Sequence, residues 1–160
     1  MLTQSRLHEL FDYLPETGEL IRKIKAGNQH PGTKAGCLSK GYYKLHVDGK
    51  LYLLHRIVWL YVYGELPEFI DHINRISTDN QIVNLRSVSK AQNQQNRNVQ
   101  KNNKAGYKGV HWDKQRSKWF ACINHQNKTI GLGRFKTAIE AHEAYKQAAK
   151  IYHTHNPSAI

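Results

Sequence analysis

The sequence predicts an α+β protein with two domains. Short apolar runs bounded by turn residues recur along most of the chain and are typical of short strands, whereas only a few segments have helical spacing. One stretch, QNQQNRNVQKNNK at residues 92–104, is almost devoid of apolar side chains and cannot contribute to a core. We therefore expect a first domain over residues 1–98, a linker over 99–104 and a second domain over 105–160.

The first domain is predicted to open with a helix and a strand. The apolar residues of the first segment have helical spacing and indicate a short helix after Thr3, within residues 2–14: Leu2, Leu7, Leu10 and Phe11. Residues 15–18, Pro-Glu-Thr-Gly, predict a turn, and residues 19–24 a strand. Residues 25–41 are rich in Gly, Lys, Asn and Pro and are predicted as a basic loop.

An Asp-Gly pair at residues 48–49 predicts a hairpin. It separates the apolar runs 42–47 and 51–54, and the tight turn between such strands needs positive φ angles. Residues 55–63 leave little polar face, so they predict a buried helix that ends at Gly64.

A strand pair and a helix are expected next. Residues 69–73 and 82–86 are predicted as strands joined by the polar loop 74–80, and a helix capped by Ser87 or Ser89 follows them. These two strands and one helix, with the preceding hairpin and helix, complete the first domain.

The second domain is predicted as a three-stranded antiparallel sheet packed on one helix. The strands are residues 107–112, 119–124 and 129–135, and a capping box at Thr137 and Glu140 opens the helix. Small and apolar side chains line one face of that helix: Ala141, Ala144, Tyr145, Ala148, Ala149 and Tyr152. The larger side chains expected in the core of this domain are Trp112, Trp119, Phe120, Phe135 and Tyr145.

The charge balance indicates a polyanionic partner. Lys and Arg total 24 against 12 acidic residues, a formal charge of +12. Residues 104–160 hold 10 basic and 3 acidic side chains, whereas residues 1–103 hold 14 and 9, so the second domain is the stronger candidate for binding phosphates. A basic protein that is merely soluble is the alternative. Double-stranded DNA is the expected partner.

Several classes of protein are excluded by composition. The two cysteines, Cys37 and Cys122, are far apart and form no CxxC pair, which argues against a thiolate zinc site. The longest apolar run, residues 57–63, is too short to span a bilayer, so no membrane partner is expected. Nothing in the sequence suggests a small-molecule cofactor.

Four polar residues have the chemistry of a metal-assisted phosphodiesterase. The carboxylate of Asp71 and the amide oxygen of Asn93 are suitable ligands for one Mg²⁺ or Mn²⁺, which takes oxygen ligands and keeps several waters. The imidazole of His72 is a suitable general base, provided that it lies at a strand end beside Asp71. Asn84 can bridge the loop and hold His72 in place. The alternative is that these residues are ordinary loop and turn formers.

The ordered blocks around these residues resemble the HNH endonucleases, especially the homing type encoded by phages and introns. The blocks are Leu54 to Trp59, Ile70 to Asn74, Thr78 to Asn80, Asn84 to Arg86 and Gln92-Asn93. The resemblance implies a ββα-metal finger that holds one divalent cation. It implies His72 as general base, Asp71 and Asn93 as metal ligands and Asn84 as the residue that orients the loop.

The same resemblance leaves some positions open. His55 is expected either to support the fold or to contact phosphate, and Arg56 either to face phosphate or to brace the finger. Arg75 stands where the family often has Gly after the Asp-His-Ile-Asn block, and Gln81 where it often has Arg. If Arg75 has a positive φ, it costs about 1 kcal/mol.

The second domain resembles the plant ethylene-response-factor (APETALA-type) DNA-binding domain over residues 105–155. The matching blocks are Gly106 to Val110, Lys118 to Ile123, Leu132 to Phe135 and Glu140 to Tyr145. That family lays its sheet in the major groove. The matched groove-facing positions are Lys108, His111, Asn124 and Thr129, where the plant domains carry Arg, and Gly131 replaces a groove-facing Trp. The candidate phosphate contacts are Lys114, Arg116, Lys118, Lys128 and Arg134.

These expectations combine into a homing-type DNA endonuclease that uses Mg²⁺ or a similar cation to cut or nick double-stranded DNA. Arg97, Lys101 and Lys104 of the linker are expected to track the DNA backbone or minor groove. A single finger cuts one strand at a time, so nicking or a transient homodimer is expected. The expected setting is the cytoplasm of a bacterial host, with a phage or mobile element as the source. The alternative is a DNA-binding regulator or architectural protein with an inactive finger.

Overall fold

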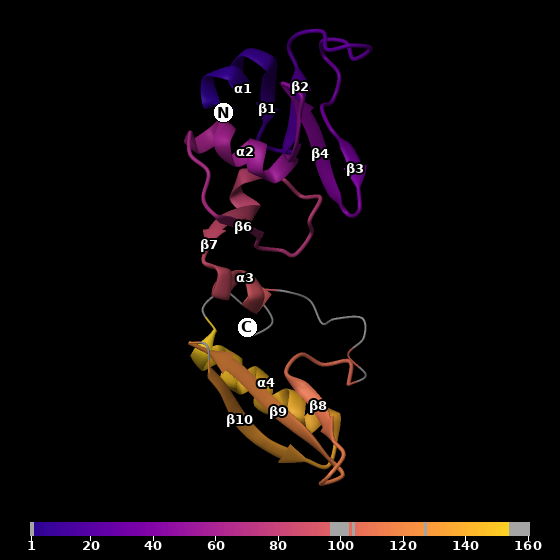
Figure 1. Cartoon of the computed structure of the whole chain (residues 1–160), viewed down its shortest axis with the longest axis vertical. Coiled ribbons are helices and arrows are strands. Elements are labelled where there is room, and N and C mark those ends of the chain that lie inside the picture. Colours follow the sequence, from indigo (N-terminus) through magenta and orange to yellow (C-terminus); the bar gives the residue numbers. More distant parts are fainter. Residues whose placement is uncertain (1, 97–102, 104, 127, 154–160) are drawn as a thin grey trace. The chain divides into compact units, whose positions relative to one another are not determined.

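Small antiparallel sheets and a few helices make up the chain, as the α+β prediction requires. The computed structural model describes residues 2–96, 103, 105–126 and 128–153. The chain divides into two compact units, Met1–Val88 and Ser89–Ile160, each of which is described by itself (Figure 1). The domain limits inferred from the polar stretch at 92–104 remain a prediction.

The first unit begins with α1 (Gln4–Leu10), whose N-cap Thr3 accepts a hydrogen bond from the backbone N–H of Arg6. The helix is shorter than the 2–14 segment within which it was expected, because Phe11 to Leu14 form the strand β1. This strand pairs with β2 (Glu19–Arg22) across the predicted turn. Phe11 is buried in this strand, and its apolar character alone does not distinguish a helix from a strand.

The predicted Asp-Gly hairpin is confirmed. It joins β4 (Tyr42–Val47) to β5 (Lys50–Leu53), and Asp48 and Gly49 have φ angles of 47° and 76°. A third strand, β3 (Cys37–Ser39), adds to the edge of β4, although the sequence predicted only a loop there.

The helix α2 (Leu54–Tyr63) packs beside α1 (Figure 1) and contributes Leu54, Ile57, Val58 and Leu60 to the core of the first unit. Gly64 ends it in the left-handed conformation, as predicted, with a φ of 76°. The largest fully buried side chains of this unit come from both helices and from β2: Leu7, Leu20, Leu54, Ile57 and Val58.

The strand pair expected after this helix consists of β6 (Phe69–His72) and β7 (Leu85–Val88). The second strand starts later than predicted, because Ile82–Asn84 form the short 3-10 helix η1. The backbone N–H of Asn84 donates to the carbonyl of Gln81 at 2.9 Å, which closes a turn instead of continuing a strand. Asn84 therefore precedes the strand in which it was placed.

The second unit begins with the seven-residue helix α3 (Lys90–Asn96). Of the two predicted caps, Ser89 is the one used: its hydroxyl accepts from Gln92 N–H, and its own N–H donates to the Gln92 side chain. The sheet that follows consists of β8 (Val110–Asp113), β9 (Lys118–His125) and β10 (Lys128–Phe135) in the order β10-β9-β8.

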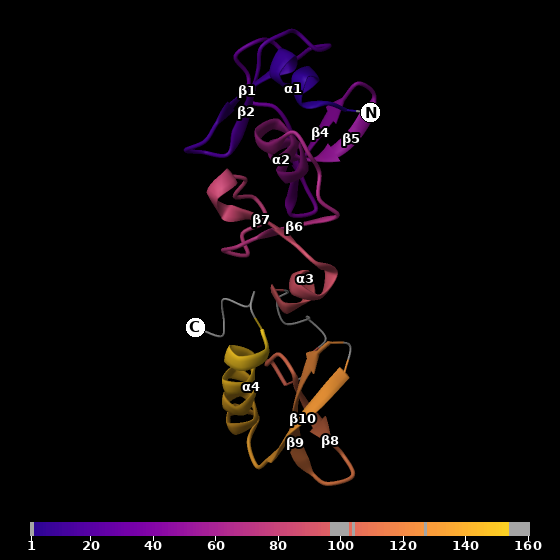
Figure 2. The same cartoon turned by 90° about the vertical axis from the view of Figure 1, so that its left-hand side faces the viewer.

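The last helix, α4 (Ala138–Tyr152), lies along one face of this sheet (Figure 2). The predicted capping box between Thr137 and Glu140 is present. The core between α4 and the sheet is made mostly of small and medium side chains: Val110, Ala121, Ile123, Ala141, Tyr145 and Ala149.

Two of the expected core aromatic residues lie elsewhere. Trp119 and Phe135 pack against the core as predicted, but Trp112 is 46% exposed. Phe120 alternates along β9 with Trp119 and Ala121, which pack in the core, so its ring is on the opposite face of the sheet. The prediction counted apolar side chains without assigning the face on which each strand residue lies.

Candidate functional site

The strand pair of the first unit places a carboxylate opposite a guanidinium. Asp71 on β6 is the cross-strand partner of Arg86 on β7. The Oδ2 atom of Asp71 accepts two hydrogen bonds from Arg86, at 3.2 Å from Nε and 2.8 Å from a terminal nitrogen. Asp71 is only 9% exposed, and the guanidinium of Arg86 balances the charge of its carboxylate. Arg86 has no recognisable role in the sequence alone, because its position opposite Asp71 depends on the strand register.

His72 is the last residue of β6, the strand-end position that the sequence analysis required for it. The imidazole is buried, and its Nε2 lies 3.5 Å from Oδ1 of Asn80. Burial lowers the pKa of His72, and the hydrogen bond to Asn80 and the charge of Asp71 oppose that shift. The ring is therefore neutral at pH 7 and able to accept a proton.

Asn84 fastens both ends of the loop between β6 and β7. Its Oδ1 accepts from the backbone N–H of Asn74 and its Nδ2 donates to the carbonyl of Asp79, each at 2.9 Å. Its own carbonyl accepts from Ile73 N–H at 2.8 Å. Asn84 is buried, and these contacts bridge the loop; its role in holding His72 in place remains a prediction.

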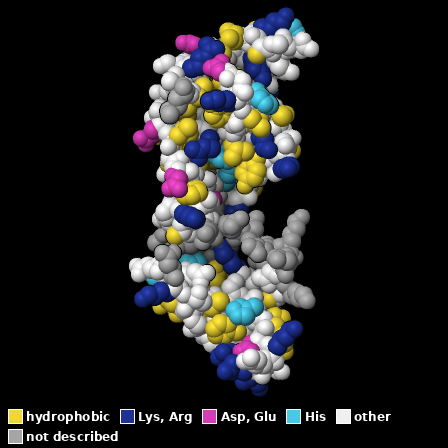
Figure 3. Space-filling model, viewed as in Figure 1, with side chains coloured by type: hydrophobic (Ala, Val, Ile, Leu, Met, Phe, Trp, Pro, Cys, Tyr) yellow, Lys and Arg dark blue, Asp and Glu magenta, His cyan; other side chains and the backbone are white. Residues whose placement is uncertain are grey.

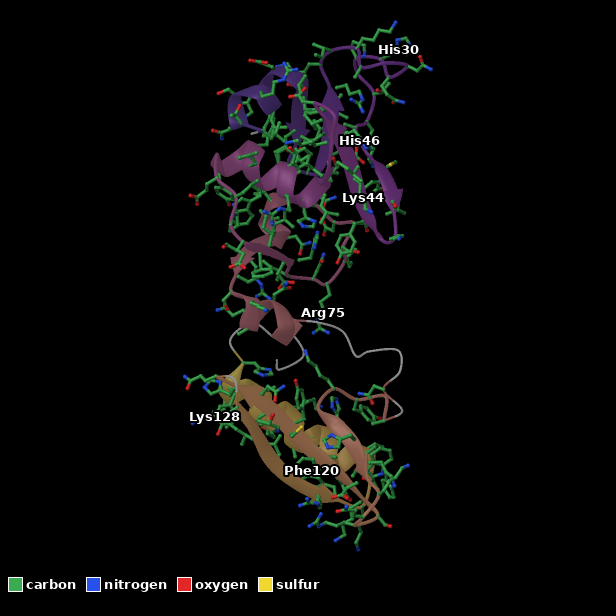
Figure 4. All side chains as sticks on the ribbon, viewed as in Figure 1. His30, Lys44, His46, Arg75, Phe120 and Lys128 are labelled. Atoms are coloured by element: carbon green, nitrogen blue, oxygen red, sulfur yellow. The ribbon has the colours of Figure 1, made fainter. Side chains whose placement is uncertain are left out.

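The same loop contains the departure from the family pattern at Arg75. This residue has a φ of 62°, a left-handed conformation that a side chain disfavours. Its backbone N–H donates to the carbonyl of His72 at 3.1 Å, so the strained turn directly follows the candidate base. Figure 4 labels Arg75 on this loop.

Two further rings surround the imidazole of His72. His55, in the first turn of α2, meets it edge to face with ring centroids 5.0 Å apart. Tyr42 on β4 lies 6.4 Å from His72 and 5.9 Å from His55. His55 is buried, and burial, with smaller effects of His72 and Arg56, lowers its pKa to about 4.

Arg56 makes the bracing contacts that were one of its two expected roles. Its guanidinium donates to the backbone carbonyls of Pro67 and Glu68, both at 3.2 Å. These bonds fix the segment that leads into β6. Contact with DNA phosphate by the same guanidinium remains a prediction.

Asn93 lies in α3, in the second unit, whereas the residues described above lie in the first. Its backbone N–H donates to the carbonyl of Ser89 at 2.9 Å, in the first turn of that helix. The linker cations Arg97, Lys101 and Lys104 lie outside the described residues.

The available donors fit a hard divalent cation better than a soft one. Within the described parts of the chain, no three His, Cys, Asp or Glu side chains cluster as ligands of one metal ion. The carboxylate of Asp71 suits Mg²⁺ or Mn²⁺, which prefer oxygen ligands and keep most of their coordination for water and phosphate. The binding of one cation by Asp71 together with Asn93 remains a prediction, since the two residues lie in different units. The ion pair with Arg86 opposes that use, because a second cation must share the carboxylate.

In the described part of the second unit, α4 packs against one face of the sheet, and the opposite face, which carries exposed side chains, is called the uncovered face. Asn124 and Thr129 are directly opposite each other on β9 and β10, and the Thr129 hydroxyl donates to Asn124 Oδ1 at 2.7 Å. His111 on β8 is exposed and meets the ring of Phe120 edge to face at 5.0 Å. Lys108 is half-buried in the loop before β8.

Most of the predicted phosphate contacts are exposed cations near the ends of the strands. Lys114 and Arg116 lie in the β8–β9 turn, and Lys118 and Lys128 are the first residues of β9 and β10. Figure 3 shows Lys and Arg side chains gathered at the end of the second unit that holds the β8–β9 turn. This arrangement suits contact with a phosphate backbone.

Arg134 is engaged within the protein. Its Nε donates to Asp113 Oδ2 at 2.8 Å, and Arg116 approaches the same oxygen at 3.5 Å. The hydrogen bond from Arg134 holds the pKa of Asp113 below its usual value. Asp113 was not singled out in the sequence, because its role arises only when three strands bring these residues together.

The comparisons with known proteins agree with this organisation. Residues 52–95 match the family model described as HNH endonuclease, and residues 105–154 match the model of the AP2 domain. None of the described helices is both long and apolar enough to cross a membrane. No solved structure matches the chain.

A curated relative is Protein 3.8 of Escherichia phage T7, which is 32% identical over 76 residues. The match covers 46% of this chain and 63% of that protein, so the chain spans less than two thirds of the relative. The chain thus carries an HNH endonuclease domain followed by an AP2 DNA-binding domain, the combination that the sequence resemblances indicated.

Proposed function

We propose that the chain is a metal-dependent endonuclease that cuts or nicks double-stranded DNA, with the sheet of the second unit as its anchor on the duplex. The observation that carries the proposal is the pair at the end of β6: a buried carboxylate, Asp71, next to a neutral imidazole, His72. The loop after this pair is held by Asn84, and the whole segment matches the HNH endonuclease model.

In this proposal His72 is the general base. When its Nε2–H donates to Asn80, Nδ1 carries the lone pair and takes a proton from the attacking water. The resulting hydroxide attacks phosphorus, the bond to the 3′ oxygen breaks, and solvent protonates the leaving oxygen. A cation held by Asp71 and Asn93 would neutralise negative charge on the scissile phosphate and on the leaving oxygen.

The charge of +12 and the exposed cations of the second unit support DNA as the substrate. The T7 relative supports a phage-encoded protein that acts in a bacterial host. A single finger would cut one strand, so we expect nicking, or a transient homodimer where both strands are cut.

The test is a plasmid incubated with the full chain and Mg²⁺. We expect conversion of supercoiled to nicked DNA, which EDTA and His72→Ala abolish. His30→Ala, which alters an exposed loop histidine, is the matched control and should leave nicking unchanged. Tight DNA binding without cleavage in any divalent cation would refute the nuclease proposal.

One observation favours the alternative of a DNA-binding regulator with an inactive finger. The buried ion pair of Asp71 with Arg86 can replace a metal ion as the partner of the carboxylate. Arg86→Gln separates the two functions. If Asp71 holds a cation in the active protein, adding Mg²⁺ should raise the melting temperature of the wild type as well as that of the variant. A rise in Arg86→Gln with none in the wild type would favour the regulator, in which Arg86 takes the place of the metal ion.

A further inference from the structure

The uncovered face of the second unit's sheet has an aromatic ring at its centre. Phe120 is on the middle strand, β9, and faces away from α4, because its neighbours Trp119 and Ala121 pack on the helix side. Figure 4 labels Phe120 on this sheet. The ring lies over Gly131 of β10: a Cβ atom at that position would be only 3.2 Å from Phe120 Cζ. The absence of a side chain at Gly131 thus makes room for the ring.

The charged group beside Phe120 is already ion-paired within the protein. The guanidinium of Arg134 stacks on the ring with 4.9 Å between its central carbon and the ring centroid, while its Nε donates to Asp113. Asp113 also lies 3.5 Å from Arg116, so its carboxylate partly offsets both guanidinium charges. The exposed lysines of the sheet, Lys114, Lys118 and Lys128, are at strand ends and turns.

This layout distinguishes two kinds of contact with a DNA duplex. Lysines at the margins of the face suit the phosphates on either side of a groove. An apolar ring at the centre, beside an ion-paired guanidinium, gains nothing from phosphate but gains from an apolar group on a base edge. In the major groove of unmodified DNA, that group is the C5 methyl of thymine.

We propose that Phe120 contacts a thymine methyl group in the major groove and gives the sheet a preference for an A·T pair at that position. This inference rests on the proposed function, in which the uncovered face of the sheet lies on double-stranded DNA. In this inference the selectivity for a base comes from van der Waals contact with Phe120. The nearby polar side chains Asn124 and Thr129 are hydrogen-bonded to each other.

The test compares two probes that differ only in the methyl group. The full chain is titrated with a 30-base-pair duplex of alternating dA and dT, and with the same duplex containing deoxyuridine in place of thymidine. Wild-type protein should bind the deoxyuridine duplex about fourfold more weakly for each methyl contact. Phe120→Ala should bind the two duplexes equally, and Phe120→Leu should retain part of the preference.

Ile151→Ala is the matched control, because it removes a similarly apolar side chain that is exposed on α4, on the other side of the sheet. It should keep the wild-type preference. Equal binding of both duplexes by the wild type would overturn the inference while leaving DNA binding intact. A wild-type preference that persists in Phe120→Ala would also overturn it. Failure to bind any duplex would overturn the proposed function and this inference together.

Discussion

At the scale of single residues, the candidate site brings together two buried imidazoles that come from different elements of the fold. His72 ends a strand and His55 begins a helix, and their rings meet at 5.0 Å. Burial lowers the pKa of both side chains, so both are neutral at pH 7. A neutral neighbour leaves His72 able to take a proton, whereas a charged His55 would oppose its protonation.

The lowered pKa of His55 makes folding stability depend on pH. The group titrates near 6.5 in the unfolded chain and at about 4 in the folded one, so the unfolded state binds the proton first as pH falls. The contribution of His55 to the free energy of unfolding is therefore fully present above about pH 6.5. As the pH falls toward 4, the free energy of unfolding decreases by on the order of 3 kcal/mol. Replacing His55 by Phe, which keeps an aromatic ring beside His72, should reduce this loss.

The measurement is urea-induced unfolding between pH 7.5 and 4, followed by hydrogen exchange in the peptides of α2. His30→Phe, at an exposed loop position, provides the control. Because the pKa of His72 is lowered as well, some dependence on pH should persist in His55→Phe. Identical pH dependence in His55→Phe and the wild type would show that His55 makes no such contribution.

How far the sequence predicts the site depends on how each residue is held. Asp71, His72 and Asn84 belong to short blocks with fixed spacing, so their neighbourhood could be inferred from the sequence. Arg86 and Asp113 could not be identified as ionic partners, because their contacts depend on strand register and on a third strand. Asn80 reaches His72 only through the fold of the intervening loop.

At the scale of elements, the first hairpin clamps the loop of the candidate site. The hydroxyl of Tyr13, on β1, donates to the carbonyl of Asn80 at 3.2 Å and accepts from Ile82 N–H at 2.8 Å. Gly18, at the β1–β2 turn, lies so close that a Cβ atom would be 2.4 Å from the backbone of Asn80 and Gln81. The hairpin thus positions the residue that bonds to His72.

Gly18→Ala should therefore disturb both folding and cleavage. The left-handed φ of 72° and the backbone clash together should cost about 2 to 4 kcal/mol, and the displaced Asn80 should reduce nicking further. Gly49→Ala is the matched control, since its φ is 76° but no atom lies within 4 Å of the added carbon. It should lose only about 1 kcal/mol. Chemical denaturation and the plasmid assay measure the two effects, and equal losses would argue against the clamp.

The elements themselves were predictable where a local signal fixes the backbone. The Asp-Gly turn, the Gly64 stop and the capping box at Thr137 are such signals, and all three are present. The end of the first helix was not predictable in this way, because strand pairing with β2 converts Phe11 to Leu14 into β1. The short strand β3 likewise exists only through its pairing with β4.

At the scale of the whole molecule, both units pair some of their cations with acids, and the second unit also exposes lysines at the ends of its strands. In the first unit several cations are paired with acids, as Arg86 is with Asp71 and Arg6 is with Asp48. In the second unit Lys114 and Lys118 are exposed around the β8–β9 turn. We therefore expect the second unit to contribute strongly to the salt dependence of DNA binding.

The double variant Lys114→Ala/Lys118→Ala tests this expectation. Each phosphate contact contributes about 0.9 to the slope of log affinity against log salt, so the loss of two should reduce the slope by about 2. Lys146→Ala/Lys150→Ala removes the same charge from α4, on the opposite side of the sheet, and should change the slope much less. Both slopes are measured by fluorescence anisotropy with one fixed duplex at salt concentrations from about 50 to about 200 mM. Equal reductions in the two variants would mean that net charge alone, and not the strand-end cations, determines how the protein binds DNA.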